Sequence, residues 1–76
     1  MNGEIPVLKA REILRILERA GFYIHHQTGS HAQLKHRQNP ILRITVPVHN
    51  KDVPKQILRS ILKQAQMSIK EFNVFR

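Results

Sequence analysis

A histidine follows a Gly-Ser pair at the point where the chain enters an alternating segment. His31 comes directly after Gly29 and Ser30. An exposed imidazole accepts or donates a proton near neutral pH. Gly29 lets an anion approach the backbone N–H groups of the turn, and Ser30 is a turn residue or a hydrogen-bond donor to phosphate. The pattern predicts acid–base chemistry at a phosphate, centred on His31.

RNA cleavage is a reaction that uses such groups. A base takes the proton of a 2′-hydroxyl, an acid protonates the departing 5′-oxygen, and cations stabilise the charge on phosphorus. Lys35 and Arg43 fall on the same predicted strand face as His31, so they are predicted to bind or neutralise phosphate. The second proton-transfer group stays open between His49, Lys35 and water.

The other four histidines do not form a metal-binding pattern. They are His25, His26, His36 and His49, and no cysteine, neighbouring carboxylate or H-x-x-x-H helix accompanies them. Strand alternation predicts that His25 and His26 point to opposite faces. The five carboxylates lie in the lead-in, in helices or at caps, so no carboxylate pair is predicted to be catalytic. No metal or other cofactor is implied.

The charge of the chain points to an anionic partner. Thirteen Lys and Arg against five Asp and Glu give a net charge of +8 with an isoelectric point near 11.0, which favours nucleic acid. Basic residues four apart line two predicted helices, and Lys55 and Arg59 are the candidates for RNA contact on the second. Only one aromatic residue, Tyr23, is predicted on the open sheet face, so recognition by backbone and shape is favoured over base stacking.

Hydrophobic periodicity divides the chain into two helices and three strands. The predicted helices are Lys9–Ala20 and Pro54–Gln66, and the predicted strands are Phe22–Gln27, His31–His36 and Ile41–Pro47. Asp52 is predicted to cap the second helix, and the capping box from Ser68 to Glu71 opens a last short helix.

The short turns predict an antiparallel three-stranded sheet with one apolar face. Phe22, Ile24 and the alternate apolar residues of the later strands form that face, and both helices are expected to cover it. Gln27 is placed on the polar face. In this register His31 lies opposite Gln27 and Thr45. The α+β order α-β-β-β-α is that of the double-stranded-RNA-binding domain.

Length and composition limit the remaining choices. The 76 residues predict a single domain, 1–76. The chain has no cysteine, so disulfides and thiolate metal sites are excluded. No apolar stretch is long enough to cross a membrane, and no signal pattern opens the chain. A cytoplasmic protein is expected.

Five segments together resemble the HicA (YcfA-like) toxin family, in the order and spacing of that family. They are Gly21-Phe22, Gly29-Ser30-His31, Val46-Pro47-Val48-His49, Leu58 to Ala65, and Ser68 to Phe72. The sequence departs from the family pattern at helix ends: Lys9 stands where Ser or Thr often caps the first helix.

The resemblance implies an mRNA interferase, the toxin of a type II toxin–antitoxin pair. It implies that His31 is the catalytic residue, that messenger RNA is the substrate, and that a HicB-like antitoxin protein covers this histidine. The alternative function is a noncatalytic RNA-binding module of the same fold. A third is a domain whose basic face binds an acidic protein.

Overall fold

The first helix, α1 (Ala10–Arg19), forms because its apolar residues recur on one side. The computed structural model describes residues 5–76. Lys9 precedes the helix and has no side-chain acceptor for its first N–H groups, but the Glu12 carboxylate accepts the Lys9 N–H at 3.1 Å. Gly21 ends the turn after the helix with φ of +105°. The helix therefore has the predicted position within one residue at each end.

Three antiparallel strands follow in the order β2-β3-β4. They are β2 (Phe22–Gln27), β3 (His31–His36) and β4 (Arg43–Pro47). The third strand begins two residues later than predicted, because the Leu42 N–H bonds to the Asn39 carbonyl and continues the turn.

The register of the sheet differs from the predicted one. Thr28 and His31 pair through a backbone hydrogen bond of 2.9 Å, so only Gly29 and Ser30 form the loop. Gln27 therefore lies opposite Ala32, and the predicted pairing of His31 with Gln27 is wrong. Gln27 therefore shares the face of buried Ala32. The prediction that Gln27 lies on the polar face is wrong.

A β-bulge in β2 reconciles this short loop with the hydrophobic pattern. The pairing shifts between Ile24 and His26, so one extra residue, His25, is accommodated. Without the shift Ile24 would lie opposite Lys35, whereas the bulge places it opposite Leu34. Ile24 shares the apolar face as predicted, although it stays 38% exposed.

The register between β3 and β4 differs from the predicted one by two residues. His31 pairs with Pro47 and Gln33 pairs with Thr45, so the predicted pairing of His31 with Thr45 is also wrong. A shift of two leaves every side chain on its predicted face.

A short second pairing joins the segment before α1 to the segment before the next helix. Strand β1 (Leu8–Lys9) pairs with β5 (Asp52–Val53). Asp52 thus belongs to a strand and does not cap the next helix, α2 (Lys55–Ala65), whose N-cap is Pro54 and has no side-chain cap. The correction has a simple cause, since Asp52 is paired with Lys9 in the strand and by charge.

The last helix, α3 (Ile69–Val74), begins with the predicted capping box. The Glu71 N–H donates to the Ser68 hydroxyl and the Ser68 N–H donates to the Glu71 carboxylate, at 3.0 and 2.9 Å. Hydrogen bonding of the carboxylate first to the Ser68 backbone N–H and then to the Ser68 side chain holds the pKa of Glu71 below its usual value. Phe72 is fully buried.

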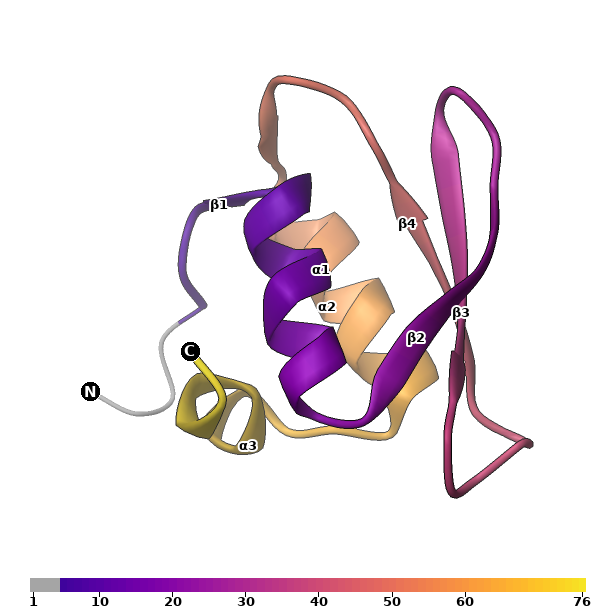
Figure 1. The fold of residues 1–76 in the computed structure, drawn as a ribbon. Coiled ribbons are helices and arrows are strands. Elements are labelled where there is room, and N and C mark those ends of the chain that lie inside the picture. The colour runs from indigo at the N-terminus through magenta and orange to yellow at the C-terminus, as the bar shows by residue number, and fades with distance from the viewer. Residues whose placement is uncertain (1–4) are drawn as a thin grey trace.

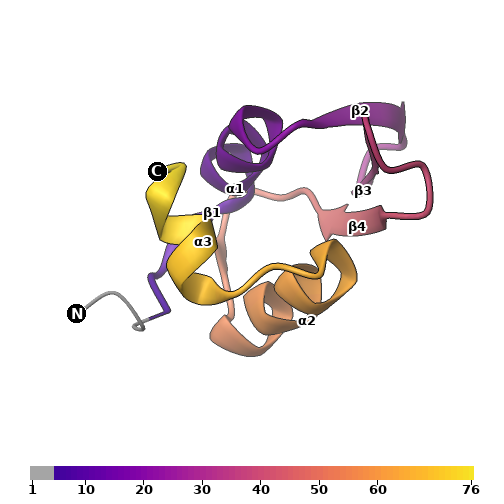
Figure 2. The same ribbon diagram turned by 90° about the horizontal axis from the view of Figure 1, so that it is seen from below.

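The elements form two layers, with the sheet on one side and α1 and α2 side by side on the other (Figures 1 and 2). α1 packs near β2 and α2 near β4, and α3 lies at the end of the helix layer away from the sheet. The fold is the predicted α+β layout of a double-stranded-RNA-binding domain, with both helices on one sheet face. The fully buried core draws on every layer: Ile13, Leu17, Phe22, Leu34, Ile44, Val46, Val53, Leu58, Ile61 and Phe72.

Candidate functional site

His31 stands at the end of a hairpin that is held by its own turn. The Thr28 hydroxyl accepts the N–H groups of Ser30 and His31 at 3.4 and 3.1 Å and donates to the His31 carbonyl at 3.3 Å. The Val48 N–H bonds to the Ser30 carbonyl at 2.8 Å. The backbone of His31 is therefore fixed from two sides.

The His31 side chain itself is exposed. Across residues 5–76 its imidazole has no hydrogen-bond partner, because the bonds at this residue involve only its backbone. Both ring nitrogens are thus available to a ligand, which is what a proton donor or acceptor needs.

Gly29 has no structural need to be glycine. It does not adopt a positive φ, and a Cβ at this position would meet no atom within 4 Å. The turn therefore leaves open space over its backbone. Ser30 is exposed in the same turn, with its carbonyl held by Val48 and its N–H by Thr28.

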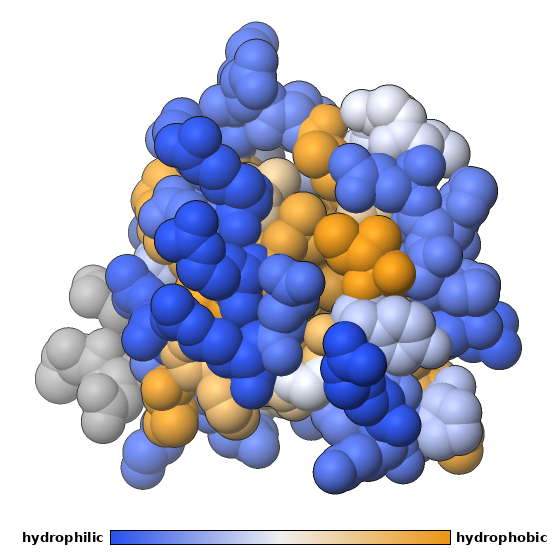
Figure 3. All heavy atoms as spheres, in the orientation of Figure 1, coloured by the Kyte–Doolittle hydropathy of each residue, from blue (hydrophilic) through white to orange (hydrophobic). Residues whose placement is uncertain are grey.

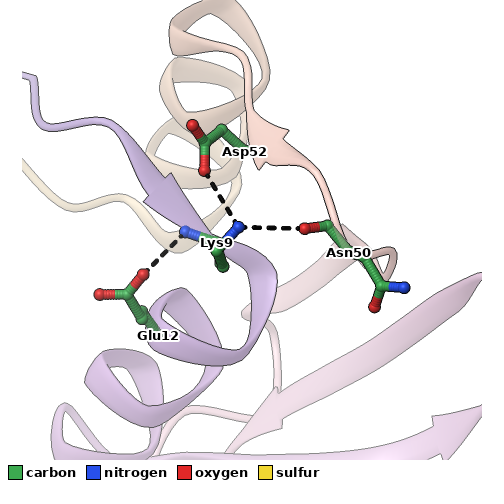
Figure 4. Close-up of polar contacts among 4 residues, drawn as sticks. All are labelled: Lys9, Glu12, Asn50 and Asp52. Atoms are coloured by element: carbon green, nitrogen blue, oxygen red, sulfur yellow. Dashed lines mark hydrogen bonds and ion pairs between the residues drawn. The ribbon is translucent and has the colours of Figure 1, made fainter.

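Lys9 anchors a loop beside this turn (Figure 4). From the sequence, this lysine was notable only as a poor cap for the first helix. The Lys9 ammonium donates to the Asn50 carbonyl at 3.2 Å and lies 3.5 Å from a carboxylate oxygen of Asp52. The contact ties the start of α1 to the connection that carries His49. No sequence signal marks it, because the partners are more than forty residues apart.

A hollow of about 510 Å³ opens between α1, the hairpin turn and this loop. His49 and Gly29 line it together with Lys9, Arg11 and Asn50. The structure thus brings His49 beside Gly29. His31 is not among the lining residues, because its side chain belongs to the outer sheet face.

That outer face carries the second group of candidates. Lys35 pairs with Tyr23 on one side and with Arg43 on the other, so the three side chains form a row across the sheet. The Arg37 guanidinium lies 5.1 Å from the centre of the Tyr23 ring. A hollow of about 270 Å³ lies here, lined by the polar residues His25, Gln33, Lys35, Arg43 and Thr45.

The two groups lie at opposite ends of the same strand face. His31 and Lys35 are four residues apart in β3, which corresponds to about 13 Å. Lys35 and its neighbour Arg43 therefore share a face with His31, as predicted, and the Lys35 backbone lies about 13 Å from that of His31.

The bulge corrects the prediction for the paired histidines of β2. His25 lines the sheet-face hollow, and His26 pairs with Gln33, which also lies on that face. The two residues were predicted to point apart because alternation assumes an unbroken strand. A bulge places two successive residues opposite one, so both belong to the polar face.

Lys55 and Arg59 of α2 are separated from this face. The Gln64 side chain accepts the Thr45 N–H at 3.0 Å, so this side of α2 faces the edge of β4. Arg59 is five residues and Lys55 nine residues away, which corresponds to rotations of about 140° and 180° around the helix. Both are exposed, and they point away from the edge that Gln64 contacts.

The basic residues of α1 are exposed, and a hydrophilic stripe runs over that helix (Figure 3). An apolar patch separates the stripe from the sheet in the same view. Arg19 at the end of α1 donates to the Phe75 carbonyl at 3.2 Å. Its guanidinium therefore holds the end of α3.

Comparison with known families supports the resemblance drawn from the five segments. The model of the HicA toxin of bacterial toxin–antitoxin systems matches residues 10–67. This chain belongs to the HicA toxin family. The match includes α1, the whole sheet and α2, and with them His31, Lys35, Arg43 and His49.

Lys9 and α3 lie outside the segment matched by the HicA family model. Each is tied to the matched region by one side-chain contact, Lys9 to Asp52 and the end of α3 to Arg19. No curated protein matches the chain at a significant level.

Within the described part of the chain, no three His, Cys, Asp or Glu side chains gather where they would hold a metal ion. Among the helices of residues 5–76, none has the length and hydropathy needed to cross a membrane.

Proposed function

We propose that this chain is a ribonuclease toxin that cleaves messenger RNA in the cytoplasm, with His31 as a general acid or base. The observation that carries the proposal is the His31 imidazole, which is exposed and without a hydrogen-bond partner among the described residues, on a backbone fixed by Thr28 and Val48. Membership of the HicA family and the net charge of +8 support an RNA substrate.

The remaining candidate residues bind different phosphates of the RNA. The open backbone at Gly29 and the exposed Ser30 hydroxyl, together with His49 at the neighbouring hollow, bind the phosphate region next to His31. Lys35 and Arg43 bind a flanking phosphate. Successive phosphorus atoms of an extended RNA strand are separated by six bonds. Consecutive Cα atoms are separated by three bonds, so the spacing between phosphates is about twice the Cα spacing, or about 7 Å. The 13 Å to Lys35 corresponds to about two such steps.

Lys55 and Arg59 contact phosphates of a longer RNA outside the sheet face, which strengthens binding without specifying a sequence. In the cell a HicB-like antitoxin covers His31 and prevents access of RNA. Neither role involves a membrane.

The first test compares induced expression of the wild type, His31→Ala and Lys70→Ala. Lys70 is an exposed residue of α3 outside the matched segment, so its variant is the control. Growth arrest and loss of intact messenger RNA are expected with the wild type and the control. We expect His31→Ala to lower the cleavage rate by about 10²–10⁴-fold, while circular dichroism shows the same fold.

Two results would contradict the proposal. If the wild type binds RNA and leaves it intact, the chain is a noncatalytic RNA-binding module. If it binds no RNA even at low salt, where phosphate contacts are strongest, the basic surface serves a protein partner.

A further inference from the structure

The bulge in β2 brings a second imidazole onto the face of His31. His26 pairs with Gln33, and Gln33 is two residues beyond His31 on the same side of β3. His26 and His31 are therefore diagonal neighbours on one sheet face, a relation that corresponds to about 7–8 Å. Both residues are exposed.

We propose that His26 is the second proton-transfer group of the cleavage reaction. The inference rests on the proposed ribonuclease function. One imidazole, in its neutral form, takes the proton of the 2′-hydroxyl as the 2′-oxygen bonds to phosphorus. The other, protonated, gives its proton to the 5′-oxygen as the P–O5′ bond breaks. The products are a 2′,3′-cyclic phosphate and a 5′-hydroxyl, and the two imidazoles have exchanged protonation states.

The spacing suits a phosphate held between the rings. Each reacting oxygen must lie about 2.6–3.2 Å from the nitrogen that exchanges its proton. Rings in contact would leave no room for the phosphate, and rings two nucleotides apart would not reach the same one. Diagonal neighbours about 7–8 Å apart can hold their rings between these limits.

The other titratable and charged groups of this face are less suitable. Lys35 and Arg43 lie in the row about 13 Å from His31, and Tyr23 in that row is covered by Arg37. His25 lines the hollow beside Lys35 and Arg43. His49 lines the other hollow, at the start of α1.

The test uses the purified full chain and an oligoribonucleotide containing a cleavage site mapped with the wild type. The variants are His31→Ala, His26→Gln and His26→Asn, with His25→Gln as the matched neighbour. We expect each His26 variant to lower kcat at least about 100-fold with little change in KM. The wild type and His25→Gln should retain a bell-shaped dependence of kcat on pH, and the His26 variants should lose one limb.

A second substrate assigns the roles. With sulfur in place of the scissile 5′-oxygen, the leaving thiolate needs no proton. The variant that lacks the general acid should then recover to within a few-fold of the wild type, and the variant that lacks the base should not. A structural role for His26 would not produce this rescue.

The outcomes separate this inference from the function on which it rests. Cleavage by the wild type, its loss in His31→Ala, and wild-type kcat with both pH limbs in the His26 variants would overturn the role of His26 alone. Absence of cleavage by the wild type would overturn both proposals.

Discussion

The two ends of β3 each carry a histidine. The ring of His36 is bonded into the fold, whereas the ring of His31 is exposed to solvent. At the far end, His36 Nδ1 accepts the N–H groups of Gln38 and Asn39, both at 3.1 Å. Its Nε2 therefore carries the hydrogen and donates to the Ala20 carbonyl at 3.2 Å. The ring also packs edge-on against Phe22, 4.8 Å between centroids. At the near end, the His31 turn is satisfied by Thr28, and the imidazole is left to solvent.

The role of each histidine depends on which group accepts the N–H groups of the adjacent turn. After His36 the chain turns back over the ring, so the free N–H groups of the turn bond to the imidazole. Before His31 a threonine hydroxyl takes that place. One ring is thereby committed to the fold, and the other is available for chemistry.

The glycines beside these two ends should respond most differently to substitution. Gly21→Ala forces a side chain into a positive φ and places a Cβ 2.7 Å from His36 Nε2. We expect a loss of about 2–4 kcal/mol in the free energy of unfolding. Gly29→Ala meets no atom, so it should leave stability unchanged or raise it by up to about 1 kcal/mol.

Urea unfolding measures both variants, and RNA cleavage completes the comparison. If a phosphate approaches the Gly29 backbone, Gly29→Ala lowers cleavage although its stability is intact. Equal destabilisation by the two alanines would show that the hairpin end is as tightly packed as the His36 end.

His36→Ala should weaken the fold without a specific effect on catalysis. It leaves two N–H groups of the turn without their acceptor, and it removes an aromatic contact. We expect the free energy of unfolding to fall by about 1–3 kcal/mol. Cleavage per folded molecule, measured well below the melting temperature, should stay close to that of the wild type. A loss of cleavage as large as that of His31→Ala would contradict the different roles assigned to His31 and His36.

Lys9→Met should have only a small effect on stability. Methionine keeps most of the aliphatic chain and removes the charge that bonds to Asn50 and Asp52. Because the pair is exposed, the loss should be below about 1 kcal/mol. Hydrogen exchange in residues 48–51 should become faster, while exchange in β3 stays the same. Unchanged exchange in this loop would show that Lys9 does not anchor it.

The helices and the apolar sheet face were predictable because periodicity is a local signal. Ile13 and Leu17, or Leu58 and Ile61, fall on one side of a helix wherever it lies in the fold. The capping box at Ser68 and the stop at Gly21 are likewise set by residues within one turn. His31 was placed on the correct face for the same reason.

The register of the strands and the face on which some side chains lie could be learned only from the tertiary structure. Whether Thr28 pairs with His31 depends on a two-residue loop, and the bulge at His25 follows from the need to bury Phe22 and Leu34 together. These choices moved His26 to the polar face and Gln27 away from it. Alternation counted along a single strand contains neither the loop length nor the bulge.

Residue types, their periodicity and the resemblance to the HicA family thus sufficed for the layers, the basic character and the candidate histidine. The separation of Lys55 and Arg59 from the sheet face, the anchoring of the loop by Lys9 and the two fates of His31 and His36 depended on contacts between distant segments. Such contacts form only when burial of one common core brings the segments together, and no local pattern records which polar groups then become neighbours.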